Sequence, residues 1–380
     1  MVGTWMQSTA QGYLVYELTR SPAYLGYVSF AAGVPTWLFM LWAGVIADRM
    51  DRRKLLVLTQ SAMMIPAILL AILTFTHWVQ PWHIIVLAVL LGVANAFDGP
   101  ARQAFILELV EDRRDLTNAI ALNATLFNSA VVIGPAMGGL AYALVGPGWC
   151  FTLNAISFIA VISALLLMRV QPFTESKNRR VSLQDMAAGL VFVAKNRVVL
   201  LITLTIGIAS IFGIGLMTLM PAWAVEILHG GPQTNGLILS ARGFGALAGS
   251  LAVASLSKIR FRGRIWMLGL FLLPTMFLLF SFSRSLPVAL FFMVLCGLGF
   301  VFTANTSNAL VQTRIPDALR GRVMSAYLLV FFGSFPIGSL FAGQMAEFIG
   351  EPRTALISSI VLLVYVIFLF LRFPEMRRLE

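Results

Sequence analysis

A charged turn at residues 44–53 restricts the fold of this chain more than any other feature. It reads Gly44-Val45-Ile46-Ala47-Asp48-Arg49-Met50-Asp51-Arg52-Arg53 and separates two long apolar segments. Such a cluster of charges is unstable in hydrocarbon. It therefore predicts a tight cytoplasmic turn between two membrane helices.

Apolar residues dominate the rest of the chain as well. Of its 380 residues, 59% are hydrophobic and 11% are charged, whereas soluble domains contain about 25% charged residues. We therefore expect an all-α, multi-pass membrane protein. Cys150 and Cys296 lack the spacing of a metal or redox motif, so we expect them to be packing residues and expect no metal site.

Twelve segments are long enough to cross a bilayer as helices. A hydrocarbon core about 30 Å thick requires about 20 apolar residues per helix. Proline residues fall at or near the breaks between the segments, where a missing backbone donor costs least. The predicted helices are residues 2–18, 23–47, 54–76, 83–108, 117–146, 150–170, 197–227, 234–256, 265–282, 287–313, 322–349 and 353–373.

The distribution of Lys and Arg predicts the orientation. Of 27 such residues, 22 fall in alternate gaps and the tail on one side, whereas Arg20, Arg284 and Arg353 fall on the other. Because basic loops remain cytoplasmic, we expect both termini in the cytoplasm and the protein in the inner (plasma) membrane. The net charge of +11 then reflects topology and attraction to membrane lipid, and we expect no nucleic-acid partner.

The two halves of the sequence are parallel copies. The segment from Gly26 to Gly33, with the charged turn after it, has a counterpart 210 residues later, from Gly236 to Gly243 with a basic segment at 258–264. This predicts a six-helix bundle in residues 1–170, a cytoplasmic linker in 171–196, a second six-helix bundle in 197–373 and a cytoplasmic tail in 374–380. In transporters with parallel repeats, the substrate site lies between the halves near the midplane.

The charged turn resembles the signature loop of the major facilitator superfamily, Gly-x-x-x-Asp-Arg-x-Gly-Arg-Arg, with Asp51 in place of the usual Gly. Four further segments are similar to the enterobactin-exporter-like, or transmembrane secretion effector, branch. Members of this branch usually carry additional residues before Gly3, so the resemblance implies a first helix that is short at its cytoplasmic end. The four segments are Asp98–Ala104, Asn118–Asn123, Gly134–Gly139 and Arg320–Ser325.

The resemblance implies roles for two groups of residues. Gly44, Asp48, Arg49, Arg52 and Arg53 would form a latch that closes the cytoplasmic side in one state; the alternative is a loop that only fixes topology. In the helix predicted at 117–146, Gly134, Pro135, Gly138 and Gly139 match an element associated with exporters, especially proton antiporters. Packing of small residues between helices explains that element equally well.

Charged residues inside predicted helices are few. Asp98 and Arg102 are one helical turn apart, so they either neutralise each other or form a protonatable or substrate-contacting site. Arg242 is either satisfied by backbone carbonyls or water, or faces a central cavity. The expected lining of the pathway is completed by Gln7, Gln11, Asn95 and Asn305, for which packing between helices is again the alternative.

These features favour a transporter over an enzyme. No nucleophile with a base, no His-Glu-x-x-His set and no phosphate-binding loop occurs in the chain, so we expect neither catalysis nor a cofactor. We expect a monomeric secondary active transporter that exports a small, largely apolar, drug-like compound by alternating access, with protons as the coupling ion. A siderophore exporter is the alternative within the class. A non-transporting receptor is the alternative outside it, although the linker is too short for a sensory domain.

Overall fold

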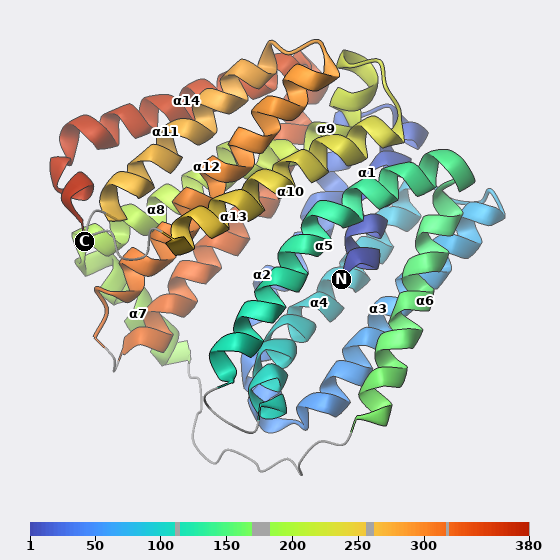
Figure 1. The fold of residues 1–380 in the computed structure, drawn as a ribbon, viewed down its shortest axis with the longest axis horizontal. Helices are drawn as coiled ribbons and strands as arrows, with labels where there is room; N and C mark the ends of the chain where they lie inside the picture. Colours follow the sequence, from blue (N-terminus) through green and yellow to red (C-terminus); the bar gives the residue numbers. More distant parts are fainter. Residues whose placement is uncertain (111–114, 169–182, 256–261, 317–318, 380) are drawn as a thin grey trace.

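A computed structural model describes residues 1–110, 115–168, 183–255, 262–316 and 319–379. Within these ranges the chain is helical and contains no strand (Figure 1). The N-terminal bundle consists of α1 (Val2–Thr19), α2 (Pro22–Arg49), α3 (Arg52–Phe75), α4 (Pro81–Leu109), α5 (Leu116–Val145) and α6 (Pro147–Leu167).

The C-terminal bundle repeats this plan with a broken first member. That member comprises α8 (Arg197–Phe212), the 3-10 helix η1 (Ile214–Leu219), α9 (Met220–Ala222) and the π-helix η2 (Trp223–Ile227). Five long helices follow: α10 (Pro232–Ser255), α11 (Arg262–Ser281), α12 (Leu286–Gln312), α13 (Arg320–Ile349) and α14 (Glu351–Arg372). Ten described helical segments are long and apolar enough to cross a membrane, and α1 and α2 complete the two sets of six.

Local sequence explains many helix boundaries. Proline occupies the first turn of α2, α4, α6, α12 and α14, where its missing N–H would lack an intrahelical partner in any case. Gly146 and Gly350 end α5 and α13 with φ of 87° and 82°, which favours glycine. Eleven of the twelve predicted helices begin and end within three residues of an observed one.

The structure differs from the expected single helix at 197–227. The α-helix stops at Gly213, and the chain continues as 3-10, α and π turns. A β-carbon on Gly215 would lie 2.5 Å from the carbonyl carbon of Gly338, so α13 approaches this segment closely. Pro221, which has no backbone N–H, lies in the same segment. Tight packing against α13 and a missing donor together account for the break.

Two shorter elements lie in regions expected to be only linker and tail. The linker contains α7 (Leu183–Lys195), and Gly189 of α7 packs against the backbone of Arg322 in α13. The tail contains the 3-10 helix η4 (Pro374–Arg378), and Met376 in it is fully buried. The backbone N–H of Gly263 donates to the carbonyl of Leu379 over 2.8 Å, which holds the tail against α11.

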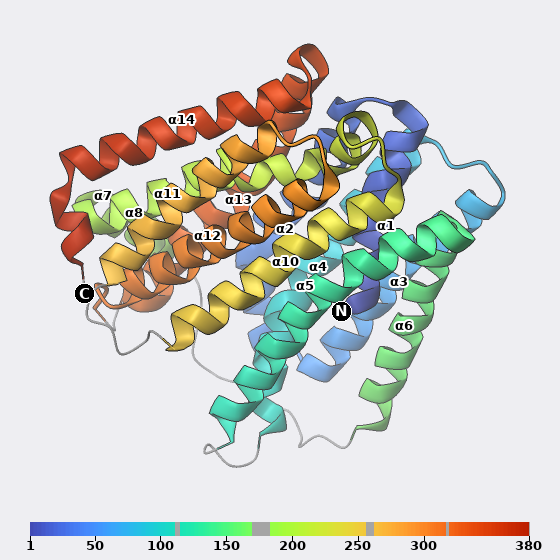
Figure 2. The same ribbon diagram turned by 45° about the horizontal axis from the view of Figure 1, so that its top comes forward.

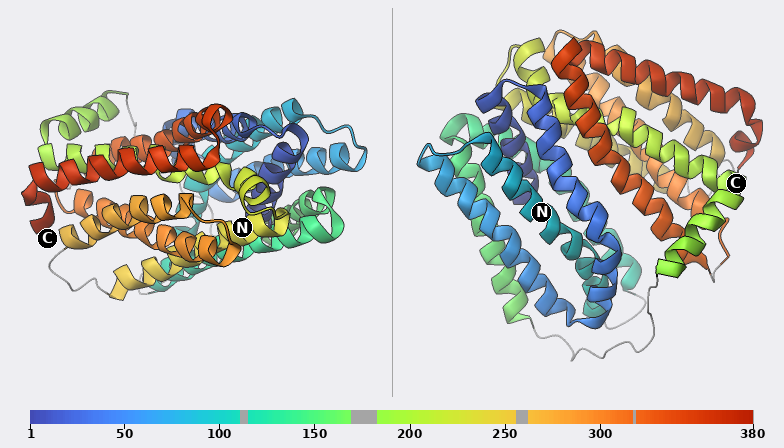
Figure 3. Two further views of the ribbon diagram at one scale, coloured as in Figure 1. Left: turned by 90° about the horizontal axis from the view of Figure 1, so that it is seen from above. Right: turned by 180° about the vertical axis from the view of Figure 1, so that it is seen from behind.

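The bundles meet through two equivalent helix pairs, α2 with α13 and α5 with α10. Gly26 lies against Gly343 in the first pair, and Gly236 lies against Gly139 in the second. Gly26 and Gly236 are the repeat-related glycines of the sequence, so the repeat produces both crossings. Figures 1 and 2 show that the two bundles lean together at one end and separate toward the end that carries α7. We call these two ends the closed end and the linker end. Figure 3 shows the same separation from behind.

Candidate functional site

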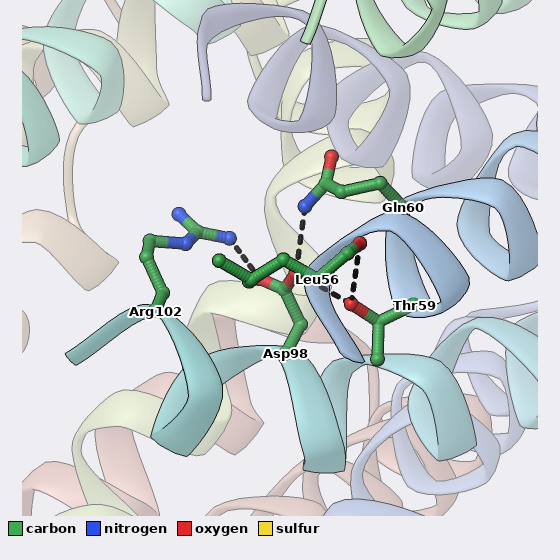
Figure 4. A network of polar contacts seen from close by, with 5 residues as sticks. All are labelled: Leu56, Thr59, Gln60, Asp98 and Arg102. Atoms are coloured by element: carbon green, nitrogen blue, oxygen red, sulfur yellow. Dashed lines mark hydrogen bonds and ion pairs between the residues drawn. The ribbon is translucent and has the colours of Figure 1, made fainter. Parts of the chain in front are cut away.

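A buried network surrounds Asp98 in the linker-end half of α4. Its carboxylate Oδ1 accepts a hydrogen bond from Gln60 Nε2 at 2.6 Å and lies 3.0 Å from Thr59 Oγ1, and its Oδ2 pairs with Arg102 (Figure 4). The Asp98 side chain is 2% exposed, whereas that of Arg102 is 34% exposed. The sequence predicted the Asp98–Arg102 pair but missed the two donors from α3.

Thr59 gives this network two possible arrangements. Its hydroxyl oxygen lies 3.1 Å from the carbonyl of Leu56 and 3.0 Å from Asp98. A hydroxyl carries one proton, so Thr59 donates to only one of these acceptors at a time. Thr59 therefore bonds either to the carbonyl of Leu56 within α3 or to the carboxylate of Asp98 in α4.

The charged turn is tied to neighbouring helix ends. Asp51, which stands where the family usually has Gly, caps α3 by accepting from the Lys54 N–H at 3.2 Å. Arg52 pairs with Glu108 at the end of α4. Arg53 donates to the carbonyls of Leu165 and Leu166 at the end of α6. These contacts all lie within the N-terminal bundle.

Two further residues of the expected latch, Gly44 and Arg49, lie in the last turns of α2. Arg49 is exposed at the end of α2. Among the described residues, no atom lies within 4 Å of a β-carbon built on Gly44. The side chain of Asp48, on which the latch prediction depends, lies outside the described residues.

The glycine-proline element of α5 packs against helices on two faces. A β-carbon on Gly134 would lie 2.4 Å from Trp5 Cβ, and one on Gly138 would lie 2.8 Å from the Met6 carbonyl, so both glycines admit α1. A β-carbon on Gly139 would lie 2.4 Å from the Pro232 carbonyl of α10, in the other bundle. Pro135 lies buried between these two faces. The element thus packs against α1 within its own bundle and against α10 in the other bundle.

Amides in the N-terminal bundle are also buried. Gln7 in α1 accepts from Asn154 Nδ2 in α6 at 2.7 Å, and its Nε2 has no hydrogen-bond partner among the described residues. Gln11, one turn later, is 6% exposed. Asn95, one turn before Asp98, is half-buried. Asn154 was not predicted from the sequence, although a lone amide in an apolar helix is the signal that could have found it.

Arg242 lies in α10 on the face opposite the exposed Leu237 and Phe244. Its side chain lies near Cys296 of α12, and its Nε atom is buried without a hydrogen-bond partner in the described part of the chain. Asn235, two turns earlier on a similar face, is fully buried, and neither polar atom of its side chain has a described partner. This face of α10 therefore carries unused hydrogen-bonding capacity.

Asn305 lines a pocket at the linker end of the C-terminal bundle. The pocket has a volume of about 510 Å³ and lies between α12, α13 and the first residue of α11. Its polar lining includes Arg262, Asn305, Asn308, Gln312, Thr313 and Tyr327. The predicted site residues therefore form separate groups in the two bundles. No group of three or more potential metal ligands occurs among the described residues.

Comparison with known proteins identifies the family. The transmembrane secretion effector family matches residues 1–380. The staphyloferrin A transporter of Staphylococcus aureus (strain NCTC 8325 / PS 47) is 26% identical over 383 residues, which cover 100% of this chain and 95% of that protein. The multidrug efflux pump Tap of Mycolicibacterium fortuitum is 26% identical over 391 residues, covering 100% of this chain and 94% of that protein. Macrolide efflux protein A of Streptococcus pyogenes is 23% identical, covering 97% and 91%.

Solved structures share the fold. The nucleoside transporter NupG superposes with a TM-score of 0.73 at 14% sequence identity, covering 100% of both chains. A POT family transporter in complex with 5-aminolevulinic acid superposes with a TM-score of 0.76 at 12% identity, covering 99% of this chain and 95% of that one. The full-length family match, with full-length transporter relatives, confirms the predicted resemblance: this chain is a membrane transporter that belongs to the transmembrane secretion effector family of the major facilitator superfamily.

Proposed function

We propose that the protein exports a small, largely apolar organic compound across the plasma membrane by alternating access, driven by protons. The observation that carries this proposal is the buried Asp98–Arg102 pair in the half of the molecule where the bundles separate. The distribution of Lys and Arg supports a cytoplasmic linker end, with both termini on that side. The conformation is then the inward-facing state of a monomeric exporter that accepts substrate from the cytoplasmic side.

Asp98 is the proposed proton carrier. As a carboxylate it is stabilised by Arg102 and by the α3 amide of Gln60. Protonation would remove the charge that holds Arg102, and the partly exposed guanidinium would take another partner. Gln7, Gln11, Asn95, Arg242 and Asn305 are the proposed contacts along the substrate pathway, because each is a polar residue on a helix of the two bundles and intramembrane polar residues mark such pathways.

The charged turn is the proposed cytoplasmic latch. Arg52 and Arg53 anchor the turn to α4 and α6, and in the proposed latch Asp48 pairs across the bundles when the cytoplasmic side closes. Asp48→Asn should slow transport at least about tenfold while membrane insertion is unchanged. Transport at the wild-type rate by correctly inserted Asp48→Asn protein would contradict the latch.

The names of the relatives support export and suggest two classes of substrate, drugs and siderophores. Two relatives are named efflux proteins for drugs, and one is named a staphyloferrin A transporter. We favour the drug-like class because two of the three compared relatives are named as efflux proteins for drugs. A siderophore exporter is the second candidate, supported by the siderophore named in the relative at 26% identity and by the unpaired Nε of Arg242.

An accumulation assay tests the proposal. Efflux-deficient cells that express the protein are loaded with neutral, cationic and anionic compounds, with and without a protonophore. We expect expression to lower the accumulation of at least one compound and the protonophore to restore it. Accumulation equal to that of empty-vector cells for the whole panel, a siderophore included, would contradict export. Efflux that persists with the protonophore but stops without sodium would contradict proton coupling.

A further inference from the structure

The pocket beside Asn305 combines one cation with several neutral hydrogen-bonding groups. Arg262, the first residue of α11, lies at the pocket together with Asn308 and Gln312 of α12. No carboxylate belongs to its lining among the described residues. Phe331 and Leu328 of α13 supply an apolar wall. The pocket thus presents a cation, with no acid in its described lining, beside an apolar wall. Such a lining suits a ligand that has an anionic part and an apolar part.

The donors of this pocket are partly committed to each other. Gln312 Nε2 donates to Asn308 Oδ1. This bond uses the amide oxygen of Asn308 and leaves its Nδ2 protons for another acceptor. Together with the guanidinium of Arg262, the pocket therefore offers more donors than acceptors. An excess of donors with a positive charge favours carboxylate oxygens over amines.

The walls of the pocket are rigidly supported. Behind α12, Trp266 Nε1 donates to Ser307 Oγ at 2.7 Å, and both residues are fully buried. Tyr327, which lines the pocket, is 2% exposed. The residue after Arg262 is Gly263, where a β-carbon would lie 2.4 Å from the carbonyl of Met376 in η4. The docked tail thus fixes the start of α11 and, with it, the backbone position of Arg262.

We propose that this pocket is an entry site for organic anions, in which Arg262 and Asn308 bind a carboxylate and Phe331 contacts an apolar or aromatic portion. The volume of about 510 Å³ is within the range that holds drug-sized molecules. Its place at the linker end puts it on the side from which an exporter loads. This inference rests on the proposed export function and narrows its substrates to compounds with a carboxylate.

Binding of three matched probes tests the site on the purified full-length protein in detergent. The probes are 2-naphthoate, the neutral 2-naphthylmethanol and the cationic 2-naphthylmethylamine, measured by isothermal titration. We expect naphthoate to bind about tenfold more tightly than the alcohol. Arg262→Gln should abolish this preference. Arg264→Gln, an exposed arginine outside the pocket lining, is the matched control and should keep it.

A second variant keeps the test decisive if Arg262→Gln folds poorly. Asn308→Asp retains the acceptor for Gln312 but adds a negative charge, so it should shift the preference toward the amine. Equal binding of all three probes to the wild type, or an unchanged preference in both pocket variants, would overturn the proposal. Arg262-dependent binding of phosphatidylglycerol without binding of naphthoate would also overturn it, because the pocket would then be a lipid site.

The efflux assay separates this inference from the proposed function. If cells that express the wild-type protein export only neutral or cationic compounds, and the Arg262→Gln variant is equally active, the export function is supported and the anion site is contradicted. If the cells export nothing while the purified protein binds naphthoate through Arg262, the proposed export function is contradicted and the anion site is supported.

Discussion

At the scale of single residues, Asp98 shows how a buried charge is accommodated. An isolated carboxylate inside a bilayer costs several kcal/mol, on the order of 2.5–3.5 by insertion scales. Here Gln60 and Arg102 donate directly to it, and Thr59 is in reach. The carboxylate is therefore stabilised by its neighbours without a ligand. Under the proposed function, its protonation would release Arg102. A single residue can thus connect proton binding with the position of a cation.

Replacing Asp98 by Asn should uncouple transport from the proton gradient. The amide mimics the neutral acid, so we expect gradient-driven efflux to fall to background while substrate binding stays within about twofold. Efflux and binding measured from about pH 6 to about pH 8 provide the check, where pH dependence should be lost. Asp51→Asn is the control: Asn also caps helices well, so this acid-to-amide change should leave efflux intact. Unchanged pH dependence in Asp98→Asn would exclude the carrier role.

Arg242 provides a second residue-scale prediction. Its repeat counterpart is Ala32, so the guanidinium is specific to one half of the molecule. Arg242→Lys keeps the charge but loses the planar fork, and substrate binding should weaken about tenfold if the contact is bidentate. Arg242→Ala should weaken binding further with normal expression.

Arg284 offers the matched control for Arg242. Its guanidinium donates to the carbonyls of Ser281 and Ser283 within its own turn, so Arg284→Ala should leave substrate binding unchanged. Equal substrate affinities of the Arg242→Ala and Arg284→Ala variants would show that Arg242 does not contact the substrate.

At the scale of elements, α5 packs both within its own bundle and against the other bundle. Gly134 and Gly138 admit α1, whereas Gly139 admits α10. The spacing of glycines in the sequence predicted close approach but could not name the partners, because the partner of each face is set by the tertiary arrangement. Gly138 and Gly139 are neighbours in the sequence, yet Gly138 contacts a helix of its own bundle and Gly139 contacts a helix of the other bundle.

Gly139→Ala should weaken the closed end specifically. Its new β-carbon would meet the Pro232 carbonyl at 2.4 Å, and such overpacking costs about 1–3 kcal/mol. We expect a lower thermal unfolding temperature and greater labelling of a cysteine placed at Tyr27 near the closed end. Gly231→Ala is the control, because no atom of the described residues lies within 4 Å of the position that its β-carbon would take. Identical labelling in the two variants would show that this crossing does not hold the end closed.

Sequence reasoning succeeded where the signal was local and failed where it was tertiary. Apolar length and proline positions predicted the helix bounds, including those of α4 and α12. The break after Gly213 was missed because Pro221 alone does not predict it, and the close packing of α13 against Gly215 could not be foreseen. Thr59 and Gln60 were missed for a similar reason: only the pairing of α3 with α4 brings them to Asp98. Hydrophobic periodicity carries no information about which polar side chains meet.

At the scale of the whole molecule, polar contacts join the bundles at the closed end. Glu226, in η2, accepts from Tyr16 at 3.0 Å, and Glu347 of α13 accepts from Ser21 at 2.6 Å. Further from that end, Thr218 of η1 donates to Ser29 of α2 at 3.2 Å. Each pair joins one bundle to the other. Under the proposed alternating access, exposure of a site to the far side of the membrane would require these contacts to separate together, because transporters of this plan largely rock one bundle against the other.

A disulfide at the Ser29–Thr218 contact tests this requirement. The side-chain oxygens lie 3.2 Å apart, so the side chains of cysteines at both positions would meet across the contact. In the Ser29→Cys/Thr218→Cys protein we expect an oxidant to stop efflux and a reductant to restore it. Each single variant should transport under both conditions, and the native Cys150 and Cys296 are buried.

The cross-linked protein should still bind substrate, because the bond closes only the end opposite the pocket at Arg262. Loss of transport with binding retained is the signature of a molecule held in one of its two states. Binding lost together with transport would instead indicate that the bond distorts the bundles. Complete cross-linking with efflux at the wild-type rate would contradict alternating access through the closed end, since substrate would then leave without separating α2 from η1.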